Sequence, residues 1–378
     1  VCIQIRVVTP FPEEKQLWMG EYKEDRRKIM SLYNRVTKQI ADEVNVQLSS
    51  EEEELLATSR SINKEAYDHY LRGLYYWDLF TPEALQQAMG HFSKAIELDP
   101  QWADPYAGLA YVWVAIHQFS GAPQEVTRPN MFNNLSKAEA LDPESSFVRY
   151  VGALVNGWTT WQFDQAIADL EYVIQKNPSD AFAHMYLAHG LACTMQQEKA
   201  EYHCRIALDL DPMNPMILAL GTAILINSQQ YQEAIDMCMQ VLSIVPGHPV
   251  ALSNLTALYL MLGDQDKAFE FWPLWVPLDE NQWNTILNLY EEEGLKPAVR
   301  LLIQYMEPVL GDQLPLDIAQ NYALIGNDSM AMQWYYKGYR EGNPMMPYMN
   351  TAFGRAEPFR IEDPAFDSLM LKIGLPIK

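Results

Sequence analysis

The sequence predicts an all-α protein, a right-handed superhelical solenoid of repeated helical hairpins with a short β-hairpin at its N-terminal end. Two observations support this prediction. Similar phrases end in a proline at Pro100, Pro143, Pro178, Pro212 and Pro246, at spacings of 43, 35, 34 and 34 residues. Between these prolines, apolar residues recur at i, i+3, i+4 and i+7, the pattern of a helix that buries one stripe.

A period near 34 residues made of two helical stretches is the signature of a tetratricopeptide array. Residues 179–212 fit this signature without a gap. Ala200 is the small residue that lets the two helices approach, and Pro212 ends the second helix because proline cannot continue one. The register predicts about eight units within residues 61–342, with an insertion at 117–131 between the helices of the second unit.

The flanking segments differ from the repeats. Residues 2–8 and 16–22 alternate apolar and polar side chains, which predicts two strands, and Asp25 is placed to cap a following helix. Because a lone hairpin is marginal in water, we interpret residues 1–60 as the C-terminal part of a small α/β domain with its linker. The chain begins at Val1 rather than Met, so we expect further sequence upstream. Residues 343–378 are expected to form a C-terminal capping tail.

The chain is acidic, with 27 Lys and Arg against 49 Asp and Glu and a formal charge of −22. Such a surface repels phosphate backbones, so we expect no nucleic-acid binding through this region. The longest apolar run, residues 216–226, is too short to cross a bilayer, which predicts no membrane span in this chain.

The cysteines Cys2, Cys193, Cys204 and Cys238 contain no C-x-x-C pair, which argues against a disulfide framework and a structural zinc site. Three of them lie in apolar helical runs, where a free cysteine packs as a small hydrophobe. The few cysteines fit the cytoplasm, and the periplasm stays open as an alternative location if a membrane span precedes Val1.

Three segments carry a family resemblance. They are LWMGEYKEDRRKIMSLYNRVTKQIADEVNVQLSSEEEELL before the repeats, EAYDHYLRGLYYWDLFTPEALQQAMGHFSKAIELDPQWADPYAGLAYVW in the first two repeats, and IEDPAFDSLMLKIGLP near the end. They resemble a group of bacterial signalling proteins in which a tetratricopeptide array follows an N-terminal effector. The resemblance implies an effector that is a winged-helix DNA-binding domain, an adenylate cyclase or a kinase, and this chain contains none of them.

The sequence contains no catalytic or cofactor-binding motif. G-x-G, G-x-x-x-x-G-K-[ST], H-E-x-x-H and G-x-S-x-G are all missing. His184, His189 and His203 form a local group that is compatible with a metal site, but packed or surface histidines are the simpler interpretation. The run EEEE at residues 51–54 is read as a solvated segment rather than a cation site. We therefore predict no enzyme activity, no cofactor and no metal for this region.

Repeat proteins bind partners on the concave face, which the first helix of each unit lines. The expected partner-binding residues are Tyr67, Tyr70, Trp77, Tyr111, Arg149, Asn156, Phe182, Met185, His189, Asn284 and Asn288, with Met216, Ser253 and Asn281 beside them. Some repeat arrays hold the acidic C-terminus of a chaperone in a clamp that needs several Lys, Arg and Asn side chains. Only Arg149 is positively charged here, which excludes this type of partner. Aromatic, Met and Asn side chains suit an apolar or amphipathic segment. Equally, these residues could pack between units or inside the superhelix.

The sequence thus predicts a non-catalytic scaffold for protein–protein interaction in a bacterial signalling protein. The partner is a protein or peptide segment, with the upstream effector domain of the same protein and a second copy of the chain as two candidates. The alternative is the C-terminal sensory or regulatory region of a winged-helix transcriptional regulator or of a nucleotide cyclase. An independent enzyme comes third, because no cluster of convergent polar groups supports one.

Overall fold

The computed structural model describes residues 2–9, 15–23, 36, 39, 62–79, 81–119 and 122–377. Contacts between Cα atoms divide the chain into two compact units, Val1–Pro105 and Tyr106–Lys378, and each unit is described by itself. The predicted division at residues 60 and 342 stays a prediction.

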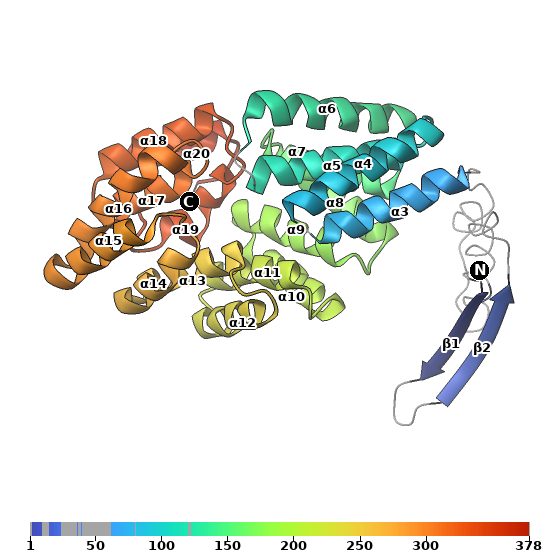
Figure 1. Cartoon of the computed structure of the whole chain (residues 1–378), viewed down its shortest axis with the longest axis horizontal. Helices are drawn as coiled ribbons and strands as arrows, with labels where there is room; N and C mark the ends of the chain where they lie inside the picture. Colours follow the sequence, from blue (N-terminus) through green and yellow to red (C-terminus); the bar gives the residue numbers. More distant parts are fainter. Residues whose placement is uncertain are drawn as a thin grey trace. The chain divides into compact units, whose positions relative to one another are not determined.

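The first unit begins with an antiparallel hairpin of β1, Cys2–Thr9, and β2, Lys15–Lys23 (Figure 1). Both predicted strands are confirmed. The helix predicted from Asp25 onward lies outside the described residues, apart from Val36 and Gln39, which are both helical.

The first unit continues with a helical hairpin of α3, Lys64–Asp78, and α4, Pro82–Leu98. The two helices approach closely at Gly73, where an added Cβ atom would lie 2.5 Å from Cε1 of Phe92. Only glycine permits this contact, because no other residue lacks the Cβ atom.

The second unit consists of helices that alternate along the chain in pairs. Their bounds are α5 Ala103–Phe119, which starts in the first unit, α6 Gln124–Leu141, α7 Ser146–Trp158, α8 Phe163–Lys176, α9 Ala181–Cys193, α10 Gln197–Leu210, α11 Pro215–Asn227, α12 Tyr231–Ile244, α13 Pro249–Leu262, α14 Gln265–Phe271, the 3₁₀ turn η2 Trp272–Leu274, α15 Glu280–Glu293, α16 Leu295–Leu310, α17 Pro315–Leu324 and α18 Asp328–Arg340. A tail follows, with the 3₁₀ turn η3 Met346–Asn350, α19 Ala352–Arg355 and α20 Pro364–Lys372.

The recurring prolines end the second helix of each pair, as predicted. Helices α4, α6, α8, α10 and α12 each stop two residues before one of them. The intervening cap residue has left the helical conformation in all five cases, with φ between −127° and −153° and ψ between 71° and 89°. A residue before proline is pushed out of the helical region by the proline ring, so the chain leaves each helix in the same direction.

The turn inside each helical pair repeats with the same regularity. Trp161, Met195, Gln229 and Gly263 follow one another at intervals of 34 residues and have φ values of 58°, 63°, 60° and 77°. Three of them are not glycine, although left-handed backbone is unfavourable for residues with a Cβ atom. The backbone itself therefore carries the 34-residue period.

The helices of the second unit form two rows, an inner row of α7, α9, α11 and α13 and an outer row of α8, α10 and α12. Consecutive inner helices pack on one another, and each outer helix packs on the inner helix of its own pair (Figure 1). Ala200 is fully buried where α10 meets α9, as predicted. The free cysteines Cys193, Cys204 and Cys238 are buried, and burial raises the pKa of each thiol, to about 12 for Cys204 and Cys238.

The insertion expected between the helices of the second unit is mostly helical. Residues 117–119 end α5, and residues 124–131 form the first part of α6, which runs through Pro129. His117 Nδ1 and Thr127 Oγ1 lie 3.0 Å apart and link the two helices. The insertion thus lengthens helices instead of forming a long loop.

Candidate functional site

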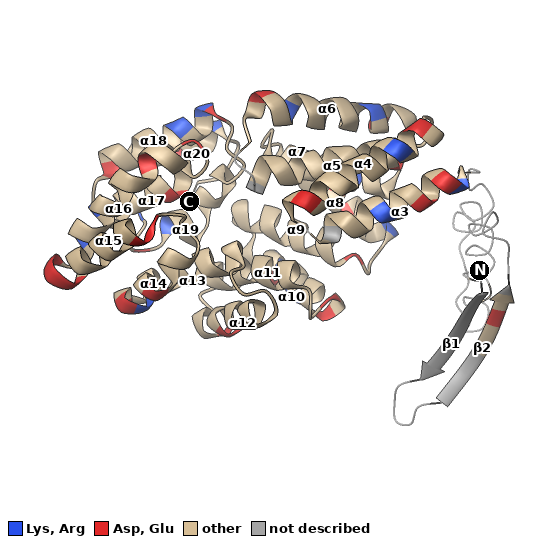
Figure 2. Ribbon diagram, in the orientation of Figure 1, with Lys and Arg blue, Asp and Glu red and all other residues tan. Residues whose placement is uncertain are grey.

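The inner surface of the second unit is the face formed by α9, α11 and α13. None of these three helices contains an Asp, Glu, Lys or Arg residue. Figure 2 shows the acidic residues elsewhere, for example at the ends of α14 and α15. The acidic residues of the chain are therefore carried by other elements, and the inner surface is apolar with scattered amides, imidazoles and hydroxyls.

Part of the inner surface is covered by the tail segment, residues 345–353. The turn η3 packs on α9, and the short helix α19 packs on α11. Asn350 donates hydrogen bonds from Nδ2 to the carbonyl oxygens of Cys193, at 2.8 Å, and Pro376, at 3.0 Å. Oδ1 of Asn227 accepts a 2.8 Å hydrogen bond from the backbone N–H of Ala352. Amide side chains and backbone groups thus hold the tail segment in place.

Tyr348 is the central side chain of the tail segment. Its hydroxyl lies 2.9 Å from Nδ1 of His189 and accepts a 3.3 Å hydrogen bond from Nε1 of Trp158. Because Nε2 of His189 lies 3.1 Å from the carbonyl oxygen of Leu220, Nε2 carries the proton and Nδ1 accepts from the tyrosine. Burial lowers the pKa of His189 to about 4, so the ring is neutral near pH 7.

A cavity of about 200 Å³ lies beside the tail segment. Helices of both ends of the second unit contribute to it, together with the tail. Its lining is Gln118, Trp158, Tyr186, His189, Leu220, Ala223, Val250, Ser253, Asn254, Thr256, Ala257, Leu260, Trp272, Trp275, Leu316, Asp317, Gln320, Asn321, Met345, Tyr348, Phe353 and Phe359. We call it the inner cavity. Most of this lining is aromatic or aliphatic.

Asp317 is the only charged residue among the described residues that line the inner cavity. It lies in the first turn of α17, and no Lys or Arg in the described part of the chain forms an ion pair with it. Enclosure by protein raises the pKa of its carboxyl to about 6, and a hydrogen bond from its own backbone N–H opposes the rise. The carboxyl is therefore mostly ionised at pH 7, without a counter-charge.

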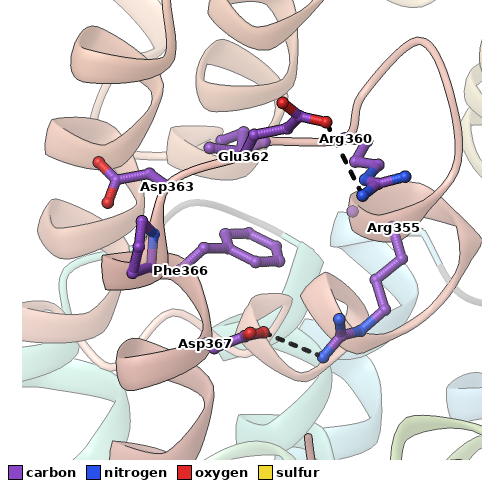
Figure 3. Close-up of a pocket in the computed structure, with 9 residues that line it drawn as sticks. Arg355, Arg360, Glu362, Asp363, Phe366 and Asp367 are labelled. Atoms are coloured by element: carbon purple, nitrogen blue, oxygen red, sulfur yellow. Dashed lines mark ion pairs between the residues drawn. The ribbon is translucent and has the colours of Figure 1, made fainter. Parts of the chain in front are cut away.

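A second pocket, of about 380 Å³, lies within the tail itself (Figure 3). Its charged groups are used in local structure. Arg355 pairs with Asp367 at 3.5 Å, and Arg360 pairs with Glu362 at 3.8 Å. Asp363 caps α20 by accepting a 2.8 Å hydrogen bond from the N–H of Ala365. With these charged groups engaged in this way, the pocket shows less sign of a ligand than the inner cavity does.

In the first unit, the residues predicted to bind a partner pack in the α3–α4 hairpin. Tyr67 and Tyr70 contact the ring of Trp102, with centroids 6.0 Å and 4.7 Å away. Tyr70 also contacts Phe92, at 5.9 Å, and Trp77 is buried. These aromatic residues belong to a packed cluster, which is the alternative that the sequence left open.

In the second unit, the structure brings only some of the predicted residues together. Tyr111 is buried and its hydroxyl lies 3.1 Å from that of Tyr150. Arg149 pairs with Glu144 at 2.8 Å and with Asp169 at 3.3 Å, so its charge is balanced. Half-buried positions are taken by Asn156, Phe182, Met216 and Ser253.

The remaining predicted residues fall into two groups. Met185 and His189 are buried on α9, and His189 contacts the tail segment. Asn281, Asn284 and Asn288 lie on α15, and all three are exposed. A partner-binding role for all these residues stays a prediction. Sequence reasoning missed Asp317, Gln118 and Tyr348, and the signal that could have found the enclosed surface is the absence of charge from α9, α11 and α13.

The histidines pair instead of clustering in threes. His184 and His203 approach at 2.9 Å between their Nδ1 atoms, and His69 and His91 do the same between α3 and α4. His189 bonds to Tyr348 and Leu220 instead. Within the described ranges, no group of three or more His, Cys, Asp or Glu residues is arranged to hold a metal ion. In that same part of the chain, no helix is long and apolar enough to cross a membrane.

Comparison with solved structures places the fold. The human IFIT1 dimer with m7Gppp-AAAA superposes with a TM-score of 0.50 at 16% identity, over 82% of this chain and 77% of that chain. Together with the paired helices and the 34-residue period of the backbone, this decides the architecture. The chain has a tetratricopeptide-type helical repeat fold. A tetratricopeptide protein of Thermus thermophilus, TTC0263, matches at 18% identity over 52% of this chain and 100% of that chain, with a TM-score of 0.41.

Among curated proteins, the chain is similar to "Putative adenylate cyclase 3" of Rhizobium meliloti (strain 1021). The two are 28% identical over 147 residues, which is 38% of this chain. The matched region spans about a quarter of the length of that cyclase, 24%. No family model matches the chain.

Proposed function

We propose that this chain is a non-catalytic interaction scaffold in a bacterial signalling protein, and that a part of its helical array left uncovered by the tail segment binds a segment of another protein domain. The observation that carries the proposal is the docked tail segment. A non-repeating piece of chain lies on α9 and α11, held by Asn227, by Asn350 and by the Tyr348–His189 contact. A partner segment would be held by the same combination of apolar area and amide bonds to its backbone.

The asparagines of α15 are the best candidates for a partner that approaches an uncovered part of the array. Asn284 and Asn288 lie four residues apart, so they share one face of the helix. Their carboxamides both donate and accept hydrogen bonds, which suits an extended backbone. The acidic run Glu291–Glu293 ends the same helix and favours a partner with basic residues beside its apolar ones.

The effector that this scaffold serves is, in our proposal, a nucleotide cyclase. The similarity to the Rhizobium meliloti protein supports this choice, because a shared repeat region next to a cyclase would explain a match limited to 24% of that protein. The scaffold would then pass the occupancy of its partner-binding surface on to the cyclase domain. The cyclase activity would belong to the upstream domain.

The test uses the full-length protein and measures conversion of ATP to cyclic AMP. The double substitution N284A/N288A should change the rate at least several-fold while thermal stability stays within the small range typical of surface changes. The matched control is Gln232→Ala on the outer helix α12, which should change neither. Direct binding is measured by titrating the purified effector domain into the 378-residue chain in a calorimeter.

Two results would count against the proposal. One is a full-length protein without cyclase activity, which removes the effector. The other is an active cyclase whose rate is the same with and without the double substitution and whose isolated domain shows no heat of binding. The other candidate partner is a second copy of the chain. Sedimentation of the chain alone tests it, since self-association would appear as a dimer.

A further inference from the structure

The inner cavity combines features that are unusual for the interior of a repeat scaffold. It holds one carboxyl group, Asp317, without a counter-ion in the described chain, and no described Lys or Arg lines it. Its one histidine, His189, has both ring nitrogens engaged and is neutral near pH 7. An uncompensated charge in an enclosed apolar site is costly, so a bound positive charge would stabilise the protein there.

The walls around Asp317 are rich in aromatic rings. Trp158, Tyr186, Trp272, Trp275 and Tyr348 all line the cavity. The indole N–H groups of two of the tryptophans are already used, since Trp158 donates to Tyr348 and Trp275 donates to Thr256 at 3.1 Å. These two indole rings therefore offer apolar surface and π faces instead of further donors. Ring faces attract cations, most strongly when the cation is desolvated.

A polar group without a partner also lines the cavity. Nε2 of Gln118, near the end of α5, is buried and makes no hydrogen bond. A buried amide donor without an acceptor is destabilising, and an acceptor oxygen on a bound molecule would remove this cost. The volume of about 200 Å³ lies below the range of drug-sized pockets, which limits the ligand to a small metabolite.

We propose that the inner cavity binds a small organic cation, an amine or quaternary ammonium compound with an apolar body and one oxygen acceptor. Asp317 balances the charge, the aromatic walls surround the apolar groups around the nitrogen, and Gln118 donates to the oxygen. Because Tyr348, Phe353 and Met345 of the tail segment form one wall, the bound molecule also holds the tail on the inner helices. This site is independent of the proposed protein partner and of the cyclase.

The experiment compares matched probes with the purified chain by calorimetry and thermal unfolding. Choline carries a trimethylammonium group and a hydroxyl. Its neutral analogue is 3,3-dimethyl-1-butanol, called dimethylbutanol below, which has a tert-butyl group in place of the cation. Benzyltrimethylammonium provides a larger cation. The expected result is saturable binding of at least one cation with a rise in melting temperature, and no rise with dimethylbutanol.

Asp317→Asn removes the charge and keeps the shape of the side chain. We expect it to weaken cation binding about tenfold or more. The variant should fold, and without ligand it should melt at a higher temperature than the parent near pH 7, because the cost of a half-buried charge without a counter-charge is gone. Asp164→Asn, at an exposed aspartate in the first turn of α8, is the matched control and should bind as the parent does.

Hydrogen exchange provides a second readout. A cation bound in the inner cavity should slow exchange of the backbone amides of residues 345–353, whereas a cation held on the acidic outer surface should not. The proposal is overturned if no cation binds up to about 10 mM, a weak affinity for a metabolite site. It is also overturned if Asp317→Asn binds cations as well as Asp164→Asn, or if dimethylbutanol binds as tightly as choline.

Discussion

Helix α9 is buried over eleven consecutive residues, Ala183–Cys193, whereas its partner α10 buries only Ala200, Cys204 and Ala207. The next pair repeats the contrast, with nine buried residues in α11 and three in α12. An outer helix needs one apolar stripe, because its other side faces water. An inner helix has no side that faces open water. One face packs on the outer helix of its own pair, and the other is covered by the tail segment or lines the inner cavity.

This contrast changes how the inner surface is interpreted. In an open array, the inner helices would present exposed polar and aromatic residues to a partner. Here Asn350 and Ala352 of the tail bond directly to α9 and α11, and Tyr348 bonds to His189. Much of the face expected to be free is already an internal interface. The asparagines of α15 are a different surface, and they carry our proposal for the partner.

The strongest test of the contrast is the same substitution on both rows of one repeat. Leu187 on α9 is fully buried, and Leu187→Ala should lower the free energy of unfolding by about 3 kcal/mol through lost burial and a cavity. Leu210 on α10 is 39% exposed, and Leu210→Ala should cost under about 1 kcal/mol. Urea unfolding measures both, and equal losses would mean that the two rows are equally buried.

The second test is acid, which acts on the buried histidines of the inner surface. The pKa of His189 is lowered to about 4 by burial, below the value of 6.5 that an unfolded chain would have. The unfolded state therefore binds the proton more readily, so the stabilisation is complete above pH 6.5 and is lost as the pH falls toward 4. Between about pH 7 and pH 5 the loss from this group is about 2 kcal/mol.

His189→Gln should flatten that part of the pH profile, measured by urea unfolding at several pH values. Asp317 acts in the opposite direction, since its pKa of about 6 is raised and its contribution falls as the pH rises through the same range. The Asp317→Asn background therefore removes this opposing contribution, and the difference made by His189→Gln within it gives the share of His189. An unchanged slope in H189Q within this background would show that His189 does not titrate as a buried group.

The third test concerns the hydroxyl that joins the tail to the inner helices. Tyr348→Phe removes the hydrogen bonds to His189 and Trp158 and leaves both of those groups buried, so the cost should be about 1–2 kcal/mol. Limited proteolysis should then cut residues 345–353 faster. Tyr202→Phe on α10, where the side chain is 64% exposed, is the control and should leave the rate unchanged.

The smallest effect is expected from the outer row. Arg205 on α10 forms an ion pair with Glu233 on α12, and both side chains are about two-fifths exposed, 39% and 43%. Solvent screens such a pair, so Arg205→Ala should cost no more than about 1 kcal/mol and less in high salt. Thermal unfolding at low and high ionic strength measures this. A loss as large as that of Leu187→Ala would place strong interactions on the outer surface.

The sequence predicted the repeat well because its signals act over short distances. A proline sets the conformation of the residue before it, and this ended α8, α10 and α12 at the expected places. Ala200 marked a close contact between α9 and α10, because a small side chain at a fixed place in the repeat lets the two helices approach. The segment 117–131 was harder, since it was expected as an insertion between two helices but mostly belongs to the helices themselves, with Pro129 in the first two turns of α6.

The sequence by itself determined the helical pairs and their 34-residue period, because steric limits within a few residues end each helix and these ends recur at a fixed spacing. The fixed spacing also marked the small residues between the helices. Only the tertiary structure decided which inner surfaces are covered and where the lone carboxyl lies. Tyr348 meets His189 across 159 positions of sequence, and Asp317 shares a cavity with Gln118. No local pattern encodes such contacts, because they depend on how the pairs stack and where the tail returns.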